Sequence, residues 1–519
     1  MESFGELFST TEERVDPVPA KLKGEWPDWL SGSFLRVGPG KYDLGDFTVN
    51  HWLDGMAILH KFQIEDGKVS FQSKYLKSDA YKKACLTQRP VFTEFGTQSY
   101  PDPCKNIFSR MFSQFEMTDN TSNNIFRIED QMFVASETCY LRKIDPDNLE
   151  TKDKVDLSKI MSVNLCSSHP LTDNTGVTYN LGCSFIGGPK YNIVKIHPSK
   201  DKNDSNPWAN TRTLAAISSS WKASYSYYHS FGMTENYLVF LEQPLLVNTL
   251  KLATSQLKGR AFTDCLDWHP QEKVKFIVIR KSTGEVLKAK YMSEEPFFTF
   301  HHVNAYEVDG QLVVDVVAYS SPEIINKLYL KKVRMNEYST EDPPQLKRII
   351  LPIVTDLQSV REGEELVHLQ GCAASAVKVK NQDGIYIRVT GVDVGEPGFE
   401  MPTINEKHTG KPYRFVYGTG AYEQGYFKNS VCKMDVETGR SWAWRGNEHQ
   451  YLSEPSFIPL PDAIEEDDGV ILCSVADIRK DFPDFLLLVD ARTMEEIGRA
   501  EVDARVPSSL HGIFLMEKN

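Results

Sequence analysis

Short runs of apolar and aromatic residues, separated by tight-turn signals, recur along the whole chain. The dipeptides Asp66-Gly67, Asp309-Gly310 and Asp383-Gly384 stand between such runs, and this arrangement is typical of β-hairpins. A looser unit, in which a charged turn joins two strand-like runs, begins near residues 143, 279, 433 and 489. Repetition of one hairpin unit predicts an all-β fold and favours a β-propeller, with a large array of β-sandwiches as the alternative.

The pattern offers no place at which the 519-residue chain divides into two domains. There is no low-complexity segment and no long linker, and closed β architectures can be large single units. We therefore expect one domain that spans residues 1–519. No run reaches the ~18 apolar residues that a membrane-spanning helix needs.

Two apolar segments stand out from the strand-like pattern. The stretch 106–115 has helical spacing. Its large apolar side chains are Ile107, Phe108, Met111, Phe112 and Phe115. The second segment carries Leu245, Leu246 and Val247, followed by Leu250 and Leu252. Each segment either packs on the core or lies in the surface of a membrane.

Composition and charge narrow the range of functions. Hydrophobic residues make up 41% of the chain and charged residues 25%, as in an ordinary globular protein. The formal net charge of −13 argues against a nucleic-acid groove, because phosphates require clustered Lys and Arg. The nine cysteines show no Cys-x-x-Cys spacing, and the start of the chain lacks the apolar core of a secretory signal. These features predict a cytoplasmic protein with free thiols.

The usual motifs of nucleotide binding and hydrolysis are missing. Gly38-Pro39-Gly40 lacks the Lys and Ser/Thr of a phosphate loop, and there is no Gly-x-Ser-x-Gly or His-Glu-x-x-His motif. Four of the twelve histidines lie in or beside strand-like runs: His169, His229, His301 and His511. A lone histidine in such a run is more often a core residue than a ligand. In a propeller, however, inner strands of different blades converge on one axis, so distant residues can meet there.

Several longer motifs occur in order along the chain. They are Leu35–Gly40, Asn50–Gly55, Thr93–Thr97, Pro101–Asn106, Tyr227–Gly232, Phe300–Asn304 and Glu465–Gly469. With the four histidines, they resemble the carotenoid cleavage oxygenases. The resemblance covers nearly the whole chain and is greatest to the animal branch: the β-carotene central-cleavage oxygenases, the insect isomero-oxygenases and the retinal pigment epithelium isomerohydrolase. It implies a seven-bladed β-propeller with iron on its axis and a few short helices capping the top face.

For the metal centre, the resemblance implies an Fe(II) ion with four histidine ligands. These are His169, His229, His301 and His511. Of the pair His301-His302 it selects His301, and successive strand residues do point to opposite faces. A second layer of carboxylates is also implied, namely Glu137, Glu400 and Glu454. They would accept the other ring N–H of three ligands, which leaves His169 without one. Four neutral imidazoles suit Fe(II) and leave two octahedral positions for O₂ and water.

The activity implied by the resemblance is oxygenase cleavage of a carotenoid. Our leading expectation is cleavage of the central 15,15′ double bond of β-carotene, or of a related carotenoid, to retinal. The alternatives are an isomero-oxygenase that gives 11-cis and all-trans retinal, off-centre cleavage, and retinyl-ester isomerohydrolysis. Tyr227 and Phe95 resemble aromatic residues of the family's substrate tunnel, where they would orient a polyene and stabilise developing positive charge. Outside the enzymes, the alternative is a carotenoid- or lipid-binding propeller, although such a scaffold has no need of four convergent imidazoles.

Carotenoids are almost insoluble in water, so the resemblance also implies contact with a membrane. The mouth of the tunnel would lie at segments 107–115 and 245–252. Cys104 occupies a position that is lipid-modified in the isomerohydrolase branch. We expect a cytoplasmic protein that associates peripherally with membranes, with a carotenoid and O₂ as its partners and no nucleic acid.

Overall fold

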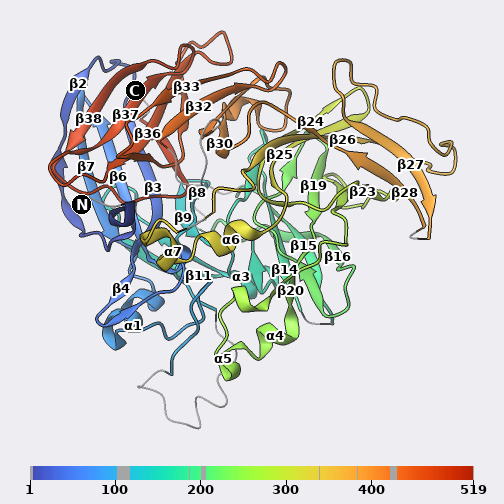
Figure 1. Cartoon of the computed structure of the whole chain (residues 1–519), viewed down its shortest axis with the longest axis horizontal. Coiled ribbons are helices and arrows are strands. Elements are labelled where there is room, and N and C mark those ends of the chain that lie inside the picture. The colour runs from blue at the N-terminus through green and yellow to red at the C-terminus, as the bar shows by residue number, and fades with distance from the viewer. Residues whose placement is uncertain are drawn as a thin grey trace.

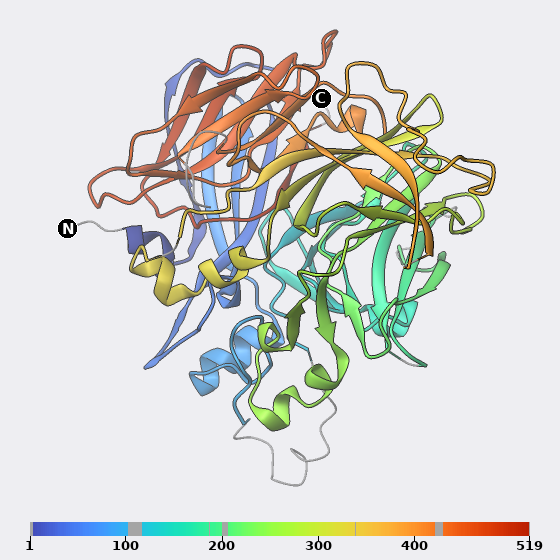
Figure 2. The ribbon, with the colours of Figure 1, turned by 45° about the vertical axis from the view of Figure 1, so that its right-hand side comes forward.

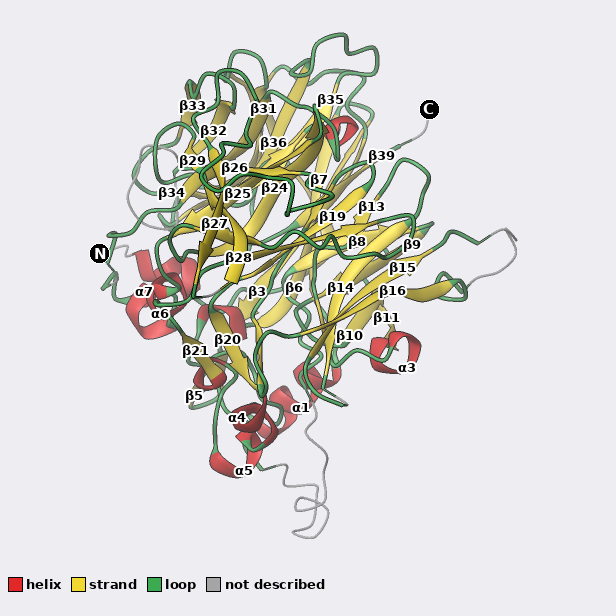
Figure 3. Ribbon diagram, turned by 90° about the vertical axis from the view of Figure 1, so that its right-hand side faces the viewer, coloured by secondary structure: helices red, strands yellow, loops and turns green. Residues whose placement is uncertain are grey.

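The computed structural model describes residues 4–101, 117–185, 187–199, 206–337, 339–382, 384–420 and 429–517. Over these residues the chain is built mostly from antiparallel β-strands, with a few short helices (Figures 1 and 3). The longest described helix, α1 (Asp79–Thr87), has nine residues. The expected all-β class with few helices is therefore confirmed. In the described part of the chain, no helix is long and apolar enough to cross a membrane.

The described strands form seven sheets of four or more strands and two smaller sheets. The first sheet contains, in spatial order, β1 (Arg14–Pro19), β7 (Lys68–Tyr75), β6 (Met56–Glu65), β3 (Gly32–Lys41) and β39 (Gly512–Met516). The second contains β11 (Thr151–Asp156), β10 (Tyr140–Ile144), β9 (Gln131–Ala135) and β8 (Asn124–Ile128). The third contains β12 (Leu165–Cys166), β14 (Thr178–Ser184), β15 (Lys190–Ile196) and β16 (Thr211–Ser218), with β13 (Leu171–Thr172) beside β14.

The remaining large sheets follow along the chain. The fourth contains β18 (Gly232–Met233), β19 (Tyr237–Glu242), β22 (Lys275–Arg280), β23 (Tyr291–Ser293), β28 (Gly384–Thr390) and β27 (Ser375–Asn381). The fifth contains β24 (Phe298–Val308), β25 (Gln311–Tyr319), β26 (Gln345–Pro352) and β29 (Val392–Asp393). The sixth contains β30 (Glu400–Ile404), β31 (Phe415–Thr419), β32 (Ser430–Asp435) and β33 (Ser441–Arg445). The seventh contains β2 (Lys21–Gly24), β38 (Glu496–Val502), β37 (Asp484–Asp490), β36 (Gly469–Asp477) and β34 (Gln450–Leu452), with β35 (Ser456–Pro459) beside β36.

Two small sheets and several short helices lie between the large sheets in sequence. The small sheets are β17 (Ser224–Ser226), β20 (Leu245–Asn248) and β21 (Leu266–Trp268), and the pair β4 (Asp43–Leu44) and β5 (Phe47–Thr48). The other α-helices are α3 (Leu157–Met161), α4 (Thr249–Ala253), α5 (Ser255–Lys258), α6 (Glu323–Lys327) and α7 (Leu330–Arg334). Single 3₁₀ turns are η1 (Phe4–Phe8), η2 (Trp52–Asp54), η3 (Thr263–Cys265) and η4 (Glu406–His408).

The turns predicted from the sequence close hairpins within these sheets. Asp66-Gly67 joins β6 to β7, and Asp309-Gly310 joins β24 to β25. Both residues of each turn have φ between 47° and 74°, as a two-residue type I′ turn requires. The four looser units fall on β10–β11, on β22 and the residues after it, on β32–β33 and on β37–β38. Asp383 lies outside the described residues.

Apolar side chains fill the space between neighbouring sheets. One cluster joins the first and seventh sheets and includes Phe34, Phe62 and Leu486. Another joins the first and second sheets and includes Val37 and Val134. The ends of the chain take part in the same arrangement, because β2 pairs with β38 and β3 pairs with β39. Strands from the beginning and the end of the chain therefore pair within the same sheets.

Candidate metal centre

Each of the four predicted ligand histidines comes from a different sheet and lies on or beside an edge strand. His511 precedes β39, His169 lies between β12 and β13, His229 precedes β18, and His301 lies within β24. The ligand atoms of all four lie within 4.8 Å of one another. Segments that are far apart in the sequence therefore meet at one point, as the propeller hypothesis required.

The positions of the ring nitrogens fit a single metal ion. The Nε2 atoms of His169 and His229 are 2.8 Å apart, and those of His301 and His511 are 3.2 Å apart. Two ligands at right angles, each about 2.1 Å from one ion, have nitrogen atoms about 3.0 Å apart. Three of the four rings are buried and the fourth is half-buried. Lone pairs directed at one another in such a space repel unless a cation lies between them, so this donor set suits a bound metal.

A carboxylate stands behind three of the four rings. Glu137 Oε1 lies 2.5 Å from His229 Nδ1, Glu400 Oε2 lies 2.8 Å from His301 Nδ1, and Glu454 Oε1 lies 2.7 Å from His511 Nδ1. These contacts favour the tautomer that leaves Nε2 free for a metal. His169 instead donates its backbone N–H to Ser167 Oγ at 3.0 Å. The structure thus places the three predicted glutamates behind three of the four predicted histidines.

The charges of the second layer follow from burial and from pairing. Burial by itself would raise the pKa of the three carboxyl groups, but the adjoining histidine and the other hydrogen-bond donors together outweigh it and lower the pKa of Glu137, Glu400 and Glu454. Burial and the neighbouring histidines lower the pKa of His169 well below its usual value. Burial also acts to lower the pKa of His301, but Glu400, with the charges of Glu454 and Glu137, outweighs it and raises that pKa. A metal ion that binds His301 therefore competes with a proton.

An irregularity in β24 separates His301 from its neighbour His302. The register between β24 and β25 shifts on either side of His302, and this residue turns to Ser230 while His301 faces the other ligands. The backbone N–H of His302 donates to Ser230 Oγ at 2.8 Å, and its Nδ1 lies 2.9 Å from the same oxygen. Burial lowers the pKa of His302 to about 3. His302 is thus a neutral neighbour of His301 that faces Ser230.

Four more residues support the centre, and sequence reasoning missed them. Ser167 Oγ accepts the backbone N–H of His169 and donates to the backbone oxygen of His229, which ties two ligand segments together. Behind the glutamates, Asn123 Nδ2 donates to Glu137, Tyr319 Oη donates to Glu400, and Arg36 Nη1 donates to Glu454. Two signals were available in the sequence. Arg36 lies within the motif at 35–40, and Ser167 lies two residues before a predicted ligand.

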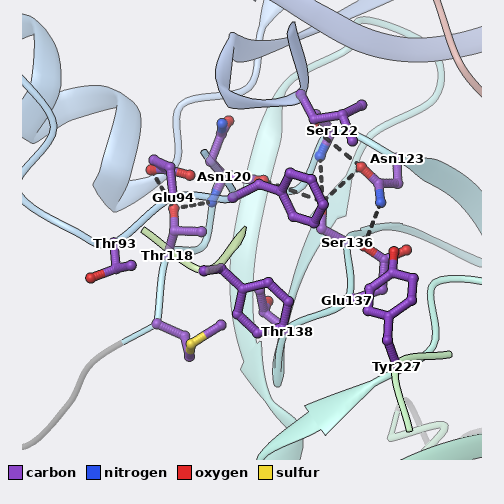
Figure 4. A pocket seen from close by; sticks show the side chains of 14 residues that line it. Thr93, Glu94, Thr118, Asn120, Ser122, Asn123, Ser136, Glu137, Thr138 and Tyr227 are labelled. Atoms are coloured by element: carbon purple, nitrogen blue, oxygen red, sulfur yellow. Dashed lines mark hydrogen bonds between the residues drawn. The ribbon is translucent and has the colours of Figure 1, made fainter. Parts of the chain in front are cut away.

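A pocket lies beside the centre (Figure 4). Glu137, Tyr227 and Phe95 line it together with Leu53 and Phe262. Figure 4 shows the ring of Tyr227 next to Glu137. Burial, with the charge of Glu137, raises the pKa of the Tyr227 phenol well above its ordinary value, so this phenol is not ionised. The two aromatic residues predicted for a substrate tunnel therefore line the same pocket as one of the supporting carboxylates.

The predicted membrane contacts of Leu245 and Leu246 are wrong. These side chains are 3% and 2% exposed, and they lie in β20 between β17 and β21, where strand pairing and core packing enclose them. Leu250, in the helix that follows, is 69% exposed. The predicted helical segment lies outside the described residues and stays a prediction. It comprises Ile107, Phe108, Met111, Phe112 and Phe115, and Cys104 precedes it.

Together, the fold and the centre define an all-β protein with a cluster of four histidines that suits a metal ion. The sequence profile of the retinal pigment epithelial membrane protein family matches residues 7–516. The carotenoid-cleaving dioxygenase, mitochondrial, of Mustela putorius furo is 41% identical over 98% of this chain and 96% of its own length. The β,β-carotene 15,15′-dioxygenases of Homo sapiens and Gallus gallus are 39% and 40% identical, over 98% of this chain and 93% and 97% of their own lengths.

Solved structures lead to the same fold. A crystal structure of cobalt-substituted apocarotenoid oxygenase from Synechocystis matches with a TM-score of 0.76 at 21% identity, and covers 100% of this chain and 99% of that one. The chain belongs to the retinal pigment epithelial membrane protein family, that is, to the carotenoid cleavage oxygenases. It is accordingly an enzyme of the dioxygenase type, and the resemblance noted in the sequence is confirmed.

Proposed function

We propose that this protein is an Fe(II)-dependent dioxygenase that cleaves the central 15,15′ double bond of β-carotene to retinal. The observation that carries the proposal is the convergence of four imidazole nitrogens, three of them backed by carboxylates, beside a pocket whose lining includes Phe95, Tyr227 and Phe262. The choice of substrate and bond is supported by 39–40% identity to proteins named β,β-carotene 15,15′-dioxygenase.

The four histidines would hold the ion, and the pocket would hold the polyene. Imidazole nitrogens bind several divalent metals, iron among them. Bound there, Fe(II) supplies the electrons that make dioxygen reactive toward a carbon–carbon double bond. One β-carotene and one O₂ give two retinal molecules, because each carbon of the broken bond takes one oxygen atom. Phe95 and Tyr227 would orient the polyene, and their ring faces would stabilise positive charge that develops along it.

Product analysis tests this proposal. The purified protein is assayed for metal and is then incubated with β-carotene in detergent under air. About one iron per chain, together with all-trans retinal, is the expected result. An iron-loaded protein that binds carotenoid without turnover would instead be a binding propeller.

Similarity to the carotenoid-cleaving dioxygenase of Mustela putorius furo makes cleavage at another bond the second candidate. An apocarotenal product identifies off-centre cleavage and contradicts the main proposal. A mixture of 11-cis and all-trans retinal identifies an isomero-oxygenase. Release of a retinol from a retinyl ester, with no product from β-carotene, identifies an isomerohydrolase.

We further propose that the seven large sheets are the blades of one propeller that spans residues 1–519. The pairing of β2 with β38 and of β3 with β39 supports this, because it joins the two ends of the chain. A single closed domain unfolds in one cooperative step. Coincident thermal transitions by circular dichroism and tryptophan fluorescence are expected, and two separable transitions would contradict one domain.

Exposed leucines support peripheral contact with a membrane. Leu86 in α1, Leu250 in α4 and Leu257 in α5 are 75%, 69% and 82% exposed. All three helices lie at the same end of the molecule (Figures 1, 2 and 3), and we call these three residues the leucine surface. The exposed Lys82 and Lys258 lie on the same helices and would attract anionic headgroups.

Vesicle flotation tests the leucine surface. The double variant L250S/L257S should float less with phosphatidylcholine–phosphatidylserine vesicles than the unmodified protein does. Ile464, in the turn between β35 and β36, is 90% exposed, so I464S is a matched control that should leave flotation unchanged. Equal losses in the double variant and in the control would reject this surface as the contact.

The cellular location is proposed from the thiols. All eight cysteines of the described residues are free, which suits a reducing compartment. We propose a cytoplasmic protein that associates peripherally with membranes. Recovery of the protein with mitochondria in cell fractionation would contradict this, and one of the similar proteins is named as mitochondrial.

A further inference from the structure

The three supporting glutamates have unequal partners. Glu137 accepts a hydrogen bond from the Asn123 amide at 2.8 Å, and Glu400 accepts one from the Tyr319 hydroxyl at 2.7 Å, so both partners are neutral. Glu454 pairs with a cation, because Arg36 Nη1 lies 2.5 Å from its Oε2. Among the described residues it is the one supporting glutamate in an ion pair with Arg or Lys.

The Arg36–Glu454 pair is buried and held in place by several contacts. Arg36 is 0% exposed and Glu454 is 9% exposed, so water screens this contact little. Arg36 Nη2 also donates to the backbone oxygen of Glu454 and to Ser456 Oγ. The guanidinium lies 4.5 Å from the centre of the Phe34 ring. The orientation of Arg36 is therefore determined by packing as well as by charge.

Strand pairing brings Arg36 next to the metal site. Arg36 lies in β3 directly opposite Gly512 of β39, and Gly512 follows the ligand His511. A Cβ atom on Gly512 would lie 2.6 Å from Arg36 Cδ, so glycine leaves room for this side chain. The contacts Arg36–Glu454–His511 thus connect β3 to the centre through Glu454, which lies between β34 and β35.

The charges that touch the centre can be counted. Glu137, Glu400 and Glu454 are counted as carboxylates, because each has one oxygen 2.5–2.8 Å from a histidine Nδ1 and accepts a hydrogen bond at its other oxygen. His60, beside Arg36, is neutral, because burial and then Arg36 lower its pKa to about 3. Glu94, on another wall of the pocket, is neutral as well, since burial raises its pKa well above the ordinary value. Three carboxylates and one guanidinium remain.

We propose that Arg36 sets the charge of the centre, so that the site is neutral with a divalent ion and holds bound iron as Fe(II). Two positive charges from the ion, three negative carboxylates and one guanidinium cancel. Loss of one electron from the iron would leave an uncompensated positive charge in the interior, which is costly. Without Arg36, the site with Fe(II) would carry one net negative charge, and loss of an electron from the iron would make it neutral. Arg36 is a positioning residue that acts through Glu454, and the inference rests on the proposal that this site binds iron.

The midpoint potential of the bound iron tests this inference. Iron-loaded protein is titrated with redox mediators, and Fe(III) is followed by electron paramagnetic resonance. In R36Q, which loses the charge and keeps hydrogen-bond donors, the Fe(III):Fe(II) ratio at a given potential should rise on the order of tenfold, for a unit charge roughly 10 Å from the ion and a dielectric constant of about 20. E454Q should lower the ratio. In R36Q/E454Q the two changes should largely cancel.

Opposite shifts separate an effect of charge from damage to the fold, which would move all variants the same way. Arg348 offers a matched control, because it is 8% exposed and donates to Asp315 at 2.9 and 2.8 Å, so R348Q should keep the original midpoint.

If R36Q does not fold, E454Q and the charge-retaining R36K still test the inference, and the midpoint of R36K should stay close to that of the unmodified protein. An unchanged midpoint in folded R36Q, or a shift of E454Q in the same direction as R36Q, overturns the inference. Failure of the unmodified protein to bind iron refutes the proposed function instead.

Discussion

Replacing Glu400 by glutamine tests whether the carboxylates behind the histidines determine metal affinity. Glu400 is 0% exposed. Its Oε2 lies 2.8 Å from His301 Nδ1 and accepts the backbone N–H of Met401 at 2.5 Å. Its Oε1 accepts the Tyr319 hydroxyl at 2.7 Å. A glutamine has the same shape and can keep its oxygen toward His301 while its amide donates to the Tyr319 oxygen. E400Q therefore removes the charge and retains the volume.

The expected effect follows from the strength of one hydrogen bond. A bond to a charged acceptor contributes about 1.5–3 kcal/mol, and a bond between neutral groups about 0.5–1.5 kcal/mol. The difference of about 1–2 kcal/mol corresponds to a roughly 5- to 30-fold loss of iron affinity in E400Q. E400A also loses the acceptor and leaves a void behind His301. Loss of such an outer partner typically costs about 10- to 100-fold, so we expect E400A to bind iron more weakly than E400Q.

Competition with a chelator of known affinity measures these constants, and circular dichroism checks that the fold is intact. Glu242 provides a matched control, because it is 1% exposed and accepts the Tyr191 hydroxyl at 3.0 Å and the Ser220 hydroxyl at 2.6 Å. The same substitution there, E242Q, should leave iron affinity unchanged. Unchanged affinity in E400Q, or an equal loss in E242Q, would refute the reasoning.

Three further predictions follow from named side chains. His229→Ala should abolish iron binding and cleavage while the circular dichroism spectrum persists, and full activity would contradict a four-ligand site. Tyr227→Phe keeps the aromatic ring and should retain kcat/KM within about threefold, whereas Tyr227→Leu should lose about tenfold in product formation; equal activities would remove the ring from the mechanism. Burial and Arg36 lower the pKa of His60 to about 3, against about 6.5 in the unfolded chain. Between these pH values only the unfolded chain binds the proton, so the free energy of unfolding falls by up to about 1.4 kcal/mol per unit as pH drops. Urea unfolding at pH 5 and pH 7 should show a smaller fall in His60→Phe, and an equal fall would reject this assignment.

Predictions from the sequence succeeded where the controlling interactions are local. Asp66-Gly67 and Asp309-Gly310 form the expected turns because two successive residues with positive φ are determined by the dipeptide itself. The prediction for Leu245 and Leu246 failed because it depended on an interaction that is not local. An apolar run has the same local pattern whether lipid or protein covers it. Here the pairing of β20 with β17 and β21 buries the two leucines inside the protein.

The candidate ligands were found through motifs and not through spacing. His169 and His511 are 342 positions apart by their numbering, and no local pattern relates them. Their rings meet because both residues lie beside inner edge strands of different sheets. Ser167 and Tyr319 illustrate what the motifs did not reveal, since a serine near a strand and a buried tyrosine are ordinary residues until their hydroxyl partners are known.

The amino-acid sequence was enough to predict the all-β class, the hairpin turns, the membership of a family and the histidines and glutamates that the structure brings together. Hydrophobic alternation and turn chemistry are encoded over a few residues, and long motifs in order identify relatives directly. Which side chains face the centre, which leucines are exposed and which charges compensate one another became clear from the three-dimensional arrangement of the strands. Burial and Coulomb interaction depend on distances in space, and strand pairing sets those distances between segments such as Arg36 and Gly512, which the chain itself keeps hundreds of residues apart.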